Sequence, residues 1–174
     1  DKIYFTTSMG VNTEMYCVDA EGTISGPLTP AGSCDGFDMF GDNVLWLGVF
    51  GDNLTELYVN GKQITFFNKE YMDSYDRVAL EPLTYHGDSD VDGWVMKPAG
   101  YEAGKKYPAI FHIHGGPNTA FTYMYHHEMQ MWANAGYFVF YCNPRGSDGR
   151  GNEFGDINGK YGTVDYDNIM EFTD

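Results

Sequence analysis

The chain has 174 residues, of which 43% are hydrophobic and 17% aromatic, so it can build a packed core and is not expected to be disordered. The formal net charge is −15, with twelve acids against four bases (net −8) in residues 1–80 and thirteen against six (net −7) in residues 81–174. This even acidity argues against nucleic acid or an anionic membrane as partner, because both need clustered Lys and Arg. No apolar run reaches the roughly 18 residues of a membrane span.

The three cysteines, Cys17, Cys34 and Cys142, have no spacing typical of a zinc site, and their number is odd. They predict buried free thiols in a reducing compartment, so we expect a cytoplasmic protein with no metal and no cofactor. The chain begins at Asp1, with neither Met nor a signal-peptide pattern, which suggests a cut rather than a natural N-terminus.

Short runs of β character fill the first half of the chain, and each is bounded by Gly, Asn, Asp or Pro. The pair Asn60-Gly61 is a strong signal for a tight hairpin. In chain order the runs read KIYFTTS, EMYCVDA, TISGPLT, GFDMF, NVLWLGVF, ELYVN and KQITFF. These runs predict an antiparallel β structure over residues 1–67.

The same runs repeat along the chain. Thr-Glu-Met-Tyr at 13–16 matches Thr-Glu-Leu-Tyr at 55–58 with an offset of 42, and Tyr4 falls on Trp46 at the same offset. A period of about 40–45 residues with about four strands per unit is typical of propeller blades, although two β meanders can also resemble each other by chance. We therefore predict that residues 1–76 form the last blades of a β-propeller, about one and three-quarter blades where a closed propeller needs at least about four.

From residue 80 the pattern changes to one of alternating strands and helices. Strand-helix-strand with buried strands predicts a parallel, right-handed crossover in an α/β sheet with both faces covered. The expected elements are a strand pair in 82–98, a strand buried on both faces at 109–114, a helix over 123–136 that ends at Gly136, a strand in 137–146, a loop over 152–162, and a helix from Thr163 onward. Met124, Met131 and Ala135 are expected on the buried side of the first helix, and Val164, Ile169 and Met170 on that of the second.

The stretch His114-Gly115-Gly116-Pro117 follows the predicted strand at 109–114. In α/β-hydrolases an HGG-type turn after a strand offers a backbone N–H to the oxyanion of an acyl-transfer intermediate. Glycine suits such a turn because a side chain would block the approach and because φ can be positive. A tight turn without any ligand explains the tetrapeptide equally well. His114 is a candidate to hold the turn through a ring hydrogen bond.

A second Gly-rich loop, Asn143 to Gly151, follows the next predicted strand. It lacks the G-x-x-x-x-G-K-[ST] pattern and is not expected to lead straight into a helix, so phosphate binding is disfavoured. Ser147 lies in Arg-Gly-Ser-Asp-Gly, which misses G-x-S-x-G at its first position. We therefore do not assign Ser147 as a nucleophile.

The histidines form no recognisable metal motif. His112 and His114 share one face of a strand, whereas His126 and His127 are adjacent to Glu128 on the predicted helix. Nothing in this spacing makes them converge on a cation. We expect His112 at the edge of the core, and His126 and His127 on the helix surface.

These motifs together resemble the prolyl oligopeptidase family of serine peptidases, in its acylaminoacyl-peptidase and dipeptidyl-aminopeptidase-like branch. The resemblance is carried by HGGP, by NPRGS-x-G-x-G-x-x-F followed by YG-x-x-D-Y-x-D, and by DVDGWVMKP, over residues 85–174 and more weakly over 1–75. It implies the C-terminal blades of a β-propeller at 1–76, followed by the N-terminal part of an α/β-hydrolase fold at 77–174. It also implies a Ser-Asp-His triad that lies beyond Asp174, so no nucleophile, acid or base is assigned here.

The resemblance implies a parent enzyme that hydrolyses short peptides by acyl transfer, with Gly115 and Gly116 on the oxyanion side and Pro117 fixing the exit of the turn. Some branches place a tyrosine hydroxyl at the position of His114, so a backbone donor is expected instead. The chain alone is expected to be inactive. An esterase or lipase, and a non-catalytic propeller interaction module, are the alternatives. Because the sheet is cut beside a parallel strand, we also expect self-association through its exposed edge.

Overall fold

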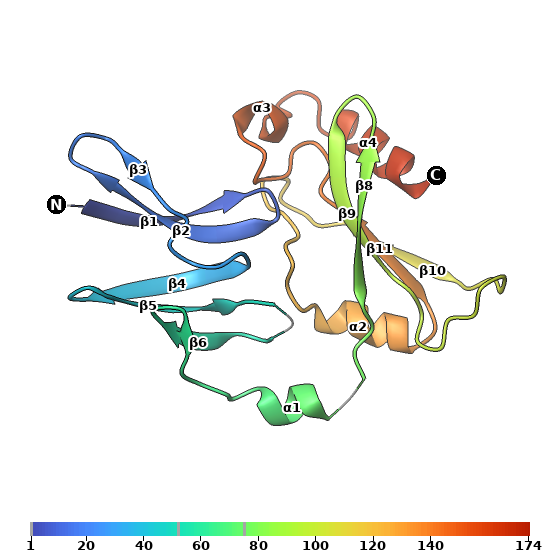
Figure 1. The fold of residues 1–174 in the computed structure, drawn as a ribbon. Helices are drawn as coiled ribbons and strands as arrows, with labels where there is room; N and C mark the ends of the chain where they lie inside the picture. The colour runs from blue at the N-terminus through green and yellow to red at the C-terminus, as the bar shows by residue number, and fades with distance from the viewer. Residues whose placement is uncertain (1, 52, 75) are drawn as a thin grey trace. The chain divides into compact units, whose positions relative to one another are not determined.

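The computed structural model describes residues 2–51, 53–74 and 76–174. The chain forms two compact units, shown in Figure 1. The N-terminal unit comprises residues 1–75 and 122–125, and the C-terminal unit comprises residues 76–121 and 126–174. The assignment of 1–76 to propeller blades and of 77–174 to a hydrolase domain stays a prediction.

The N-terminal unit is a seven-stranded sheet in the order β1-β2-β4-β5-β6-β7, with β3 paired to β2 (Figure 1). All pairs are antiparallel except β2 with β4, which meet in parallel at Thr13 and Ser33. The sheet is therefore a group of three strands followed by a meander of four. The strands are β1 (Lys2–Met9), β2 (Asn12–Asp19), β3 (Ile24–Ser25), β4 (Ser33–Phe40), β5 (Asn43–Val49), β6 (Glu56–Val59) and β7 (Lys62–Gln63).

The sequence repeat corresponds to a structural repeat. β1 and β2 occupy the places that β5 and β6 occupy in the second group. In each group a threonine hydroxyl replaces a ladder partner, because Met15 N–H donates to Thr29 Oγ1 at 3.1 Å and Leu57 N–H donates to Thr65 Oγ1 at 2.9 Å. Met15 and Leu57 are equivalent at the offset of 42, so the repeat preserves a hydrogen bond from a backbone N–H to a threonine hydroxyl as well as side-chain type.

The predicted Asn60-Gly61 hairpin turn is confirmed. Asn60 has φ +47° and Gly61 φ +83°, the two positive values of a type I′ turn that joins β6 to β7. Glycine and asparagine tolerate this region without the steric cost of other side chains.

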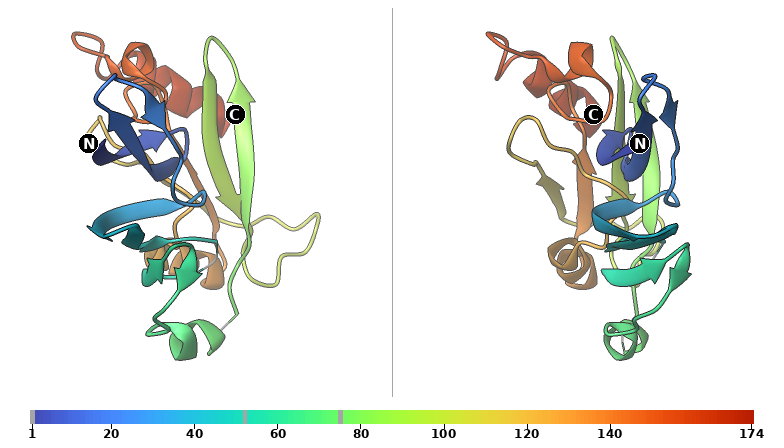
Figure 2. Two further views of the ribbon diagram at one scale, coloured as in Figure 1. Left: turned by 60° about the vertical axis from the view of Figure 1, so that its left-hand side comes forward. Right: turned by 90° about the vertical axis from the view of Figure 1, so that its left-hand side faces the viewer.

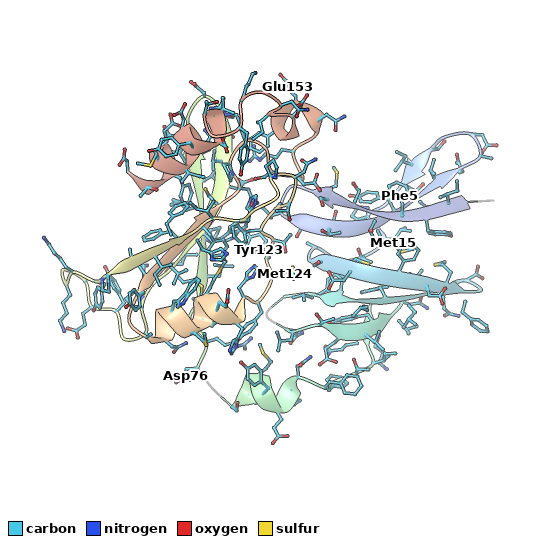
Figure 3. All side chains as sticks on the ribbon, turned by 180° about the vertical axis from the view of Figure 1, so that it is seen from behind. Phe5, Met15, Asp76, Tyr123, Met124 and Glu153 are labelled. Atoms are coloured by element: carbon cyan, nitrogen blue, oxygen red, sulfur yellow. The ribbon has the colours of Figure 1, made fainter. Side chains whose placement is uncertain are left out.

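The core of the N-terminal unit gathers around aromatic rings. The Trp46 and Tyr58 rings stack at 6.0 Å between centroids, and Phe50 meets Tyr58 edge-on at 5.0 Å. Met15, labelled in Figure 3, is fully buried beside them, together with Cys34. The short helix α1 (Lys69–Asp73) follows the sheet and was not predicted, because five residues are too few to show a helical period.

The buried carboxylate of Glu56 links two segments of the N-terminal unit. Glu56 accepts hydrogen bonds from the Thr65 hydroxyl, from the backbone N–H groups of Phe67 and Asn68, and from the Asn68 amide. Burial raises the pKa of the Glu56 carboxyl, but the hydrogen bonds outweigh burial and hold the pKa below its ordinary value. The charged form of Glu56 therefore ties β6 to the segment before α1.

The C-terminal unit contains a four-stranded sheet in the order β10-β11-β9-β8. β10 and β11 are parallel, which confirms the predicted crossover, whereas β11 with β9 and β9 with β8 are antiparallel. Figure 2 shows β8 and β9 as a long hairpin. The strands are β8 (Leu80–His86), β9 (Asp90–Met96), β10 (Ala109–His112) and β11 (Phe138–Cys142). The expectation that residues 109–114 are a strand buried on both faces is wrong, because β10 ends at His112, is only half-buried and pairs only with β11 within the described residues.

The two faces of this sheet are covered by different segments. Cys142 packs with Val91 and with Phe172 of α4 (Val164–Thr173). Tyr141 instead meets the Phe121 ring at 4.9 Å. Since adjacent residues of a strand point to opposite faces, α4 lies on one face and the segment around Phe121 on the other.

The helix predicted over 123–136 is shorter than expected: α2 is His127–Asn134. Its buried residues are Met129, Gln130 and Ala133, and Met131, expected inside, is 51% exposed. Its end at Gly136 is confirmed. Gly136 has φ +95°, its N–H donates to Ala133 O, and the Tyr137 N–H donates to Trp132 O, the pair of bonds of a Schellman motif.

Two further helices lie near the C-terminus. Residues 152–162 were predicted as loop, but Asn152–Gly155 form the short helix α3. The predicted helix from Thr163 is confirmed as α4, although Thr163 makes no side-chain cap and the buried residues are Asn168 and Phe172 rather than Met170. α4 packs closely because Gly93 has no side chain, since a Cβ there would lie 2.4 Å from Phe172.

The three cysteines are free and buried, as predicted. Burial raises the pKa of the Cys142 thiol to about 12. Within residues 2–51, 53–74 and 76–174, no helix is long and apolar enough to cross a membrane.

Candidate functional site

The turn 114–117 and the loop 143–151 begin at the same edge of the sheet in the C-terminal unit. β10 ends at His112 and β11 at Cys142, and because these strands are parallel, their carboxyl ends lie side by side. The turn 114–117 follows the first strand and the loop 143–151 follows the second. In α/β sheets this edge is where ligands bind.

The glycine turn has one position that demands glycine and one that does not. Gly116 has φ +136°, and a Cβ there would lie 3.0 Å from Asn118 N and 3.1 Å from Thr119 Cγ2. At Gly115 an added Cβ would meet nothing within 4 Å, and its φ is not in the left-handed region. Neither glycine N–H finds an acceptor among the described residues. Both donors are therefore free to bind a ligand oxygen.

His114 makes two hydrogen bonds through its ring. Nδ1 lies 3.0 Å from Gly115 O, and Nε2 lies 3.0 Å from the Oγ of Ser147. The edge of the ring also packs against Phe121 at 5.1 Å between centroids. A ring hydrogen bond from His114 to the glycine turn is thus present in the structure.

Ser147 is enclosed in the protein. Only 1% of its surface is exposed, and its backbone N–H donates to Pro144 O at 3.0 Å. A hydroxyl with this burial is not accessible to a substrate carbonyl, which agrees with the absence of a G-x-S-x-G motif around it. Sequence reasoning did not foresee the bond from Ser147 to His114, which spans 33 positions.

The loop 143–151 packs against the glycine turn 114–117 and against the residues that follow that turn. The Asp148 N–H donates to Thr119 O at 3.0 Å. Gly146 allows close contact, because a Cβ there would meet Ile157 at 2.6 Å and the Pro117 side chain at 3.4 Å. The turn after β10 and the loop after β11 therefore form one packed element.

Asn143 fixes the entry to this loop. Its side chain is buried, accepts the Phe121 N–H at 2.8 Å and donates to Phe121 O at 2.9 Å. Its own N–H donates to Asp92 O at 2.8 Å. One amide side chain thus satisfies both backbone groups of Phe121, which would otherwise be buried without partners.

Both arginines of the loop are engaged with protein groups. The Arg145 backbone N–H and Nε donate to Asn168 Oδ1, and Asn168 is fully buried on α4. Arg150 binds Asp92 through Nη2 at 2.6 Å and Nε at 3.1 Å. The expectation that this loop does not lead straight into a helix is wrong, because α3 begins at Asn152. The cations that a phosphate cradle needs are nevertheless turned toward the protein, so phosphate binding stays disfavoured.

The other histidines do not converge on a common point. His112 packs between Phe121 and Trp132, at 5.4 and 5.6 Å between ring centroids. His126, expected on the helix surface, is instead half-buried before α2, against the rings of Phe121 and Tyr141. Burial, and secondarily the nearby His112, lower the pKa of His126. Only His127 is exposed as predicted. Within the described part of the chain, no group of three or more His, Cys, Asp or Glu is placed to hold a metal ion.

The fold and the site together define a class of protein. The C-terminal unit is an α/β unit with an HGG-type turn directly after a parallel strand, a combination found in α/β-hydrolases. The resemblance to the prolyl oligopeptidase family is confirmed, because residues 123–174 match the model of that family.

Relatives and solved structures agree with the family. The chain is 40% identical over 116 residues to the uncharacterized peptidase YuxL of Bacillus subtilis, a match that covers 65% of this chain and 18% of the relative. It is 38% identical over 86 residues to dipeptidyl-peptidase 5 of Aspergillus fumigatus, which covers 48% of this chain and 12% of that one. The acylaminoacyl peptidase of Pyrococcus horikoshii superposes on 98% of this chain with a TM-score of 0.87 and 28% identity. This chain spans 28% of that structure, so it corresponds to a part of each of these proteins.

Proposed function

We propose that these residues form the oxyanion side of a serine peptidase that hydrolyses short peptides. The observation that carries the proposal is the Gly115-Gly116 turn, which follows a parallel strand and presents two N–H groups without an acceptor in the described chain. The names of the similar proteins, a peptidase, a dipeptidyl-peptidase and an acylaminoacyl peptidase, support a peptide substrate.

In the proposed reaction a serine Oγ attacks the scissile carbonyl while a histidine takes its proton, and the same histidine returns that proton to the leaving amine. Water then cleaves the acyl-serine bond by the same route. The negative charge on the carbonyl oxygen is stabilised by a backbone N–H, which is typically worth about 2.7–4 kcal/mol of the barrier. Gly115 and Gly116 are the candidates for this donor.

No G-x-S-x-G elbow occurs in the 174 residues. We therefore expect the 174-residue chain alone to hydrolyse no peptide and to resist labelling by a fluorophosphonate probe, which reacts with activated serines. The parent protein, which would supply the elbow, is the positive control. A labelled band from the 174-residue chain would show that a nucleophile lies within it.

The substrate preference is tested on the parent protein, because the 174-residue chain alone is expected to be inactive. We expect it to cleave acylaminoacyl- or dipeptidyl-nitroanilides faster than short-chain esters of matched size. Faster turnover of esters would instead indicate an esterase or lipase. Absence of both activities, with no probe labelling of the parent, would favour a non-catalytic interaction module.

The N-terminal unit fits the proposal as part of a propeller that restricts access to small peptides. Its repeated strand groups and the threonine bonds of each group support this assignment.

Self-association through β10 is a further proposal, because β10 pairs only with β11 in the described chain. Light scattering tests it, and a monomer with a cooperative melting transition would contradict it.

A further inference from the structure

The two hydrogen bonds of His114 determine where its ring proton lies. Gly115 O is a carbonyl oxygen and can only accept, so His114 Nδ1 carries the proton in the 3.0 Å bond to it. In the uncharged ring Nε2 then has only a lone pair. It accepts from the Ser147 hydroxyl, which lies 3.0 Å away. The donor direction thus runs from Ser147 through the imidazole to the glycine turn.

The burial of Ser147 supports the assignment of its hydroxyl as the donor to His114 Nε2. With 1% of the residue exposed, water does not compete for the hydroxyl proton. The His114 ring is the one hydrogen-bond partner of this hydroxyl among the described residues. A buried hydroxyl left without an acceptor would cost about 1–3 kcal/mol. The fold therefore favours the ring tautomer that presents a bare Nε2 to Ser147.

The bond to Gly115 O also orients a second group. The Gly115 carbonyl and the Gly116 N–H belong to one peptide unit, which is planar and, unlike Gly116-Pro117, trans. Carbonyl and N–H point in opposite directions across a trans peptide. A hydrogen bond that fixes Gly115 O therefore also fixes the direction of the Gly116 N–H.

We propose that Ser147 is a positioning residue: its hydroxyl holds His114 in the Nδ1–H tautomer and, through Gly115 O, aims the Gly116 N–H. The inference rests on the proposed function only in naming that N–H an oxyanion donor. It selects Gly116 over Gly115 as the donor, and it assigns a role to a serine that is not a nucleophile.

The tautomer is measured directly by long-range ¹H–¹⁵N NMR of the histidine rings at about pH 8, where an ordinary imidazole is uncharged. The His114 signals are assigned by their loss in His114→Asn. We expect the Nδ1–H tautomer in the wild-type protein and a shift toward Nε2–H in Ser147→Ala. An Nε2–H tautomer in the wild type overturns the proposal, and this result stands even if Ser147→Ala fails to fold.

A matched control separates positioning from packing. Ser33 is also buried, and its hydroxyl donates to the Asp35 carboxylate in the N-terminal unit. Ser33→Ala removes a comparable hydroxyl and should leave the His114 tautomer unchanged. If Ser147→Ala folds and keeps the wild-type tautomer, Ser147 only fills space and the proposal is wrong.

Kinetics of the parent protein test the consequence. Ser147→Ala should lower kcat by about tenfold or more, up to the roughly 10²–10³-fold that loss of an oxyanion donor costs, with little change in KM, because the oxyanion exists only after attack. A changed tautomer with unchanged kcat would overturn the aiming of Gly116. A wild-type parent without peptidase activity would count against the proposed function and leave the tautomer result standing.

Discussion

The two glycines of the turn differ so much in backbone and surroundings that alanine should affect them in different ways. At Gly116 alanine must adopt φ +136° with its Cβ 3.0 Å from Asn118 N. Strain of this kind costs about 1–3 kcal/mol per residue, so Gly116→Ala should lower the free energy of unfolding by about 2 kcal/mol. At Gly115 the added methyl meets open space, and alanine should be neutral or stabilise by up to about 1 kcal/mol through the unfolded chain.

Urea unfolding, followed by circular dichroism, measures both variants against the wild type. With a slope of about 2 kcal/mol per molar urea, Gly116→Ala should lower the midpoint by roughly 1 M and Gly115→Ala should leave it unchanged or raise it slightly. Equal midpoints for the two variants would refute the reasoning from backbone conformation.

The activity of the parent protein tests the functional half of the same argument. If the Gly116 N–H is the oxyanion donor, the backbone shift in Gly116→Ala should lower kcat/KM by roughly 10²–10³-fold at a temperature where the variant is fully folded. Wild-type kcat/KM in folded Gly116→Ala would show that this turn is structural only.

Three further predictions concern buried groups. Asn143→Ala leaves both backbone groups of Phe121 without partners and should lower the free energy of unfolding by about 2–5 kcal/mol in a urea titration; a loss below 0.5 kcal/mol would contradict the assigned bonds. The pKa of Glu56 is held below its ordinary value, so its stabilisation is present above about pH 4.3 and is lost as the pH falls. Glu56→Gln should therefore destabilise by about 1–3 kcal/mol at pH 7 and by progressively less toward pH 3, whereas a pH-independent difference would refute the role of the charge. Because burial raises the pKa of Cys142 to about 12, iodoacetamide should label this thiol at pH 8 only after unfolding, as peptide mapping can show, and fast labelling of the folded protein would contradict the burial.

The strand repeat and the crossover could be predicted because they depend on local chemistry. Asn60-Gly61 favours one turn type whatever surrounds it, and the offset of 42 reflects strand groups with the same internal bonds. The apolar runs within 109–114 and 137–146 likewise predicted two parallel strands. In each case the residue types of a short segment reveal the element, even where its hydrogen-bond partner is distant in sequence.

The boundaries and faces of the helices depend on contacts that are distant in sequence. The predicted helix over 123–136 began too early. Met124 and Met131, whose spacing suggested the helix, do not share a buried helical face, because α2 begins only at His127. The backbone just before it, at Phe121, is held instead by the Asn143 side chain, 22 positions away. Met131 is exposed because Met129 and Ala133 form the buried face, a choice that helical periodicity alone cannot make.

In the candidate site, too, the features that depend on local sequence could be predicted, and the contacts between distant segments could not. The glycine turn was located from its place after a strand, since both its residue types and its position are local. Ser147 is not predicted to be a nucleophile, because its neighbours lack the required first glycine, but a failed motif says nothing of other roles. Its bond to His114 exists only because β10 and β11 are parallel neighbours, which brings the segments that follow them together. A serine that is too buried to attack a substrate is for the same reason well suited to fix the proton of a neighbouring ring, since no water competes for its hydroxyl.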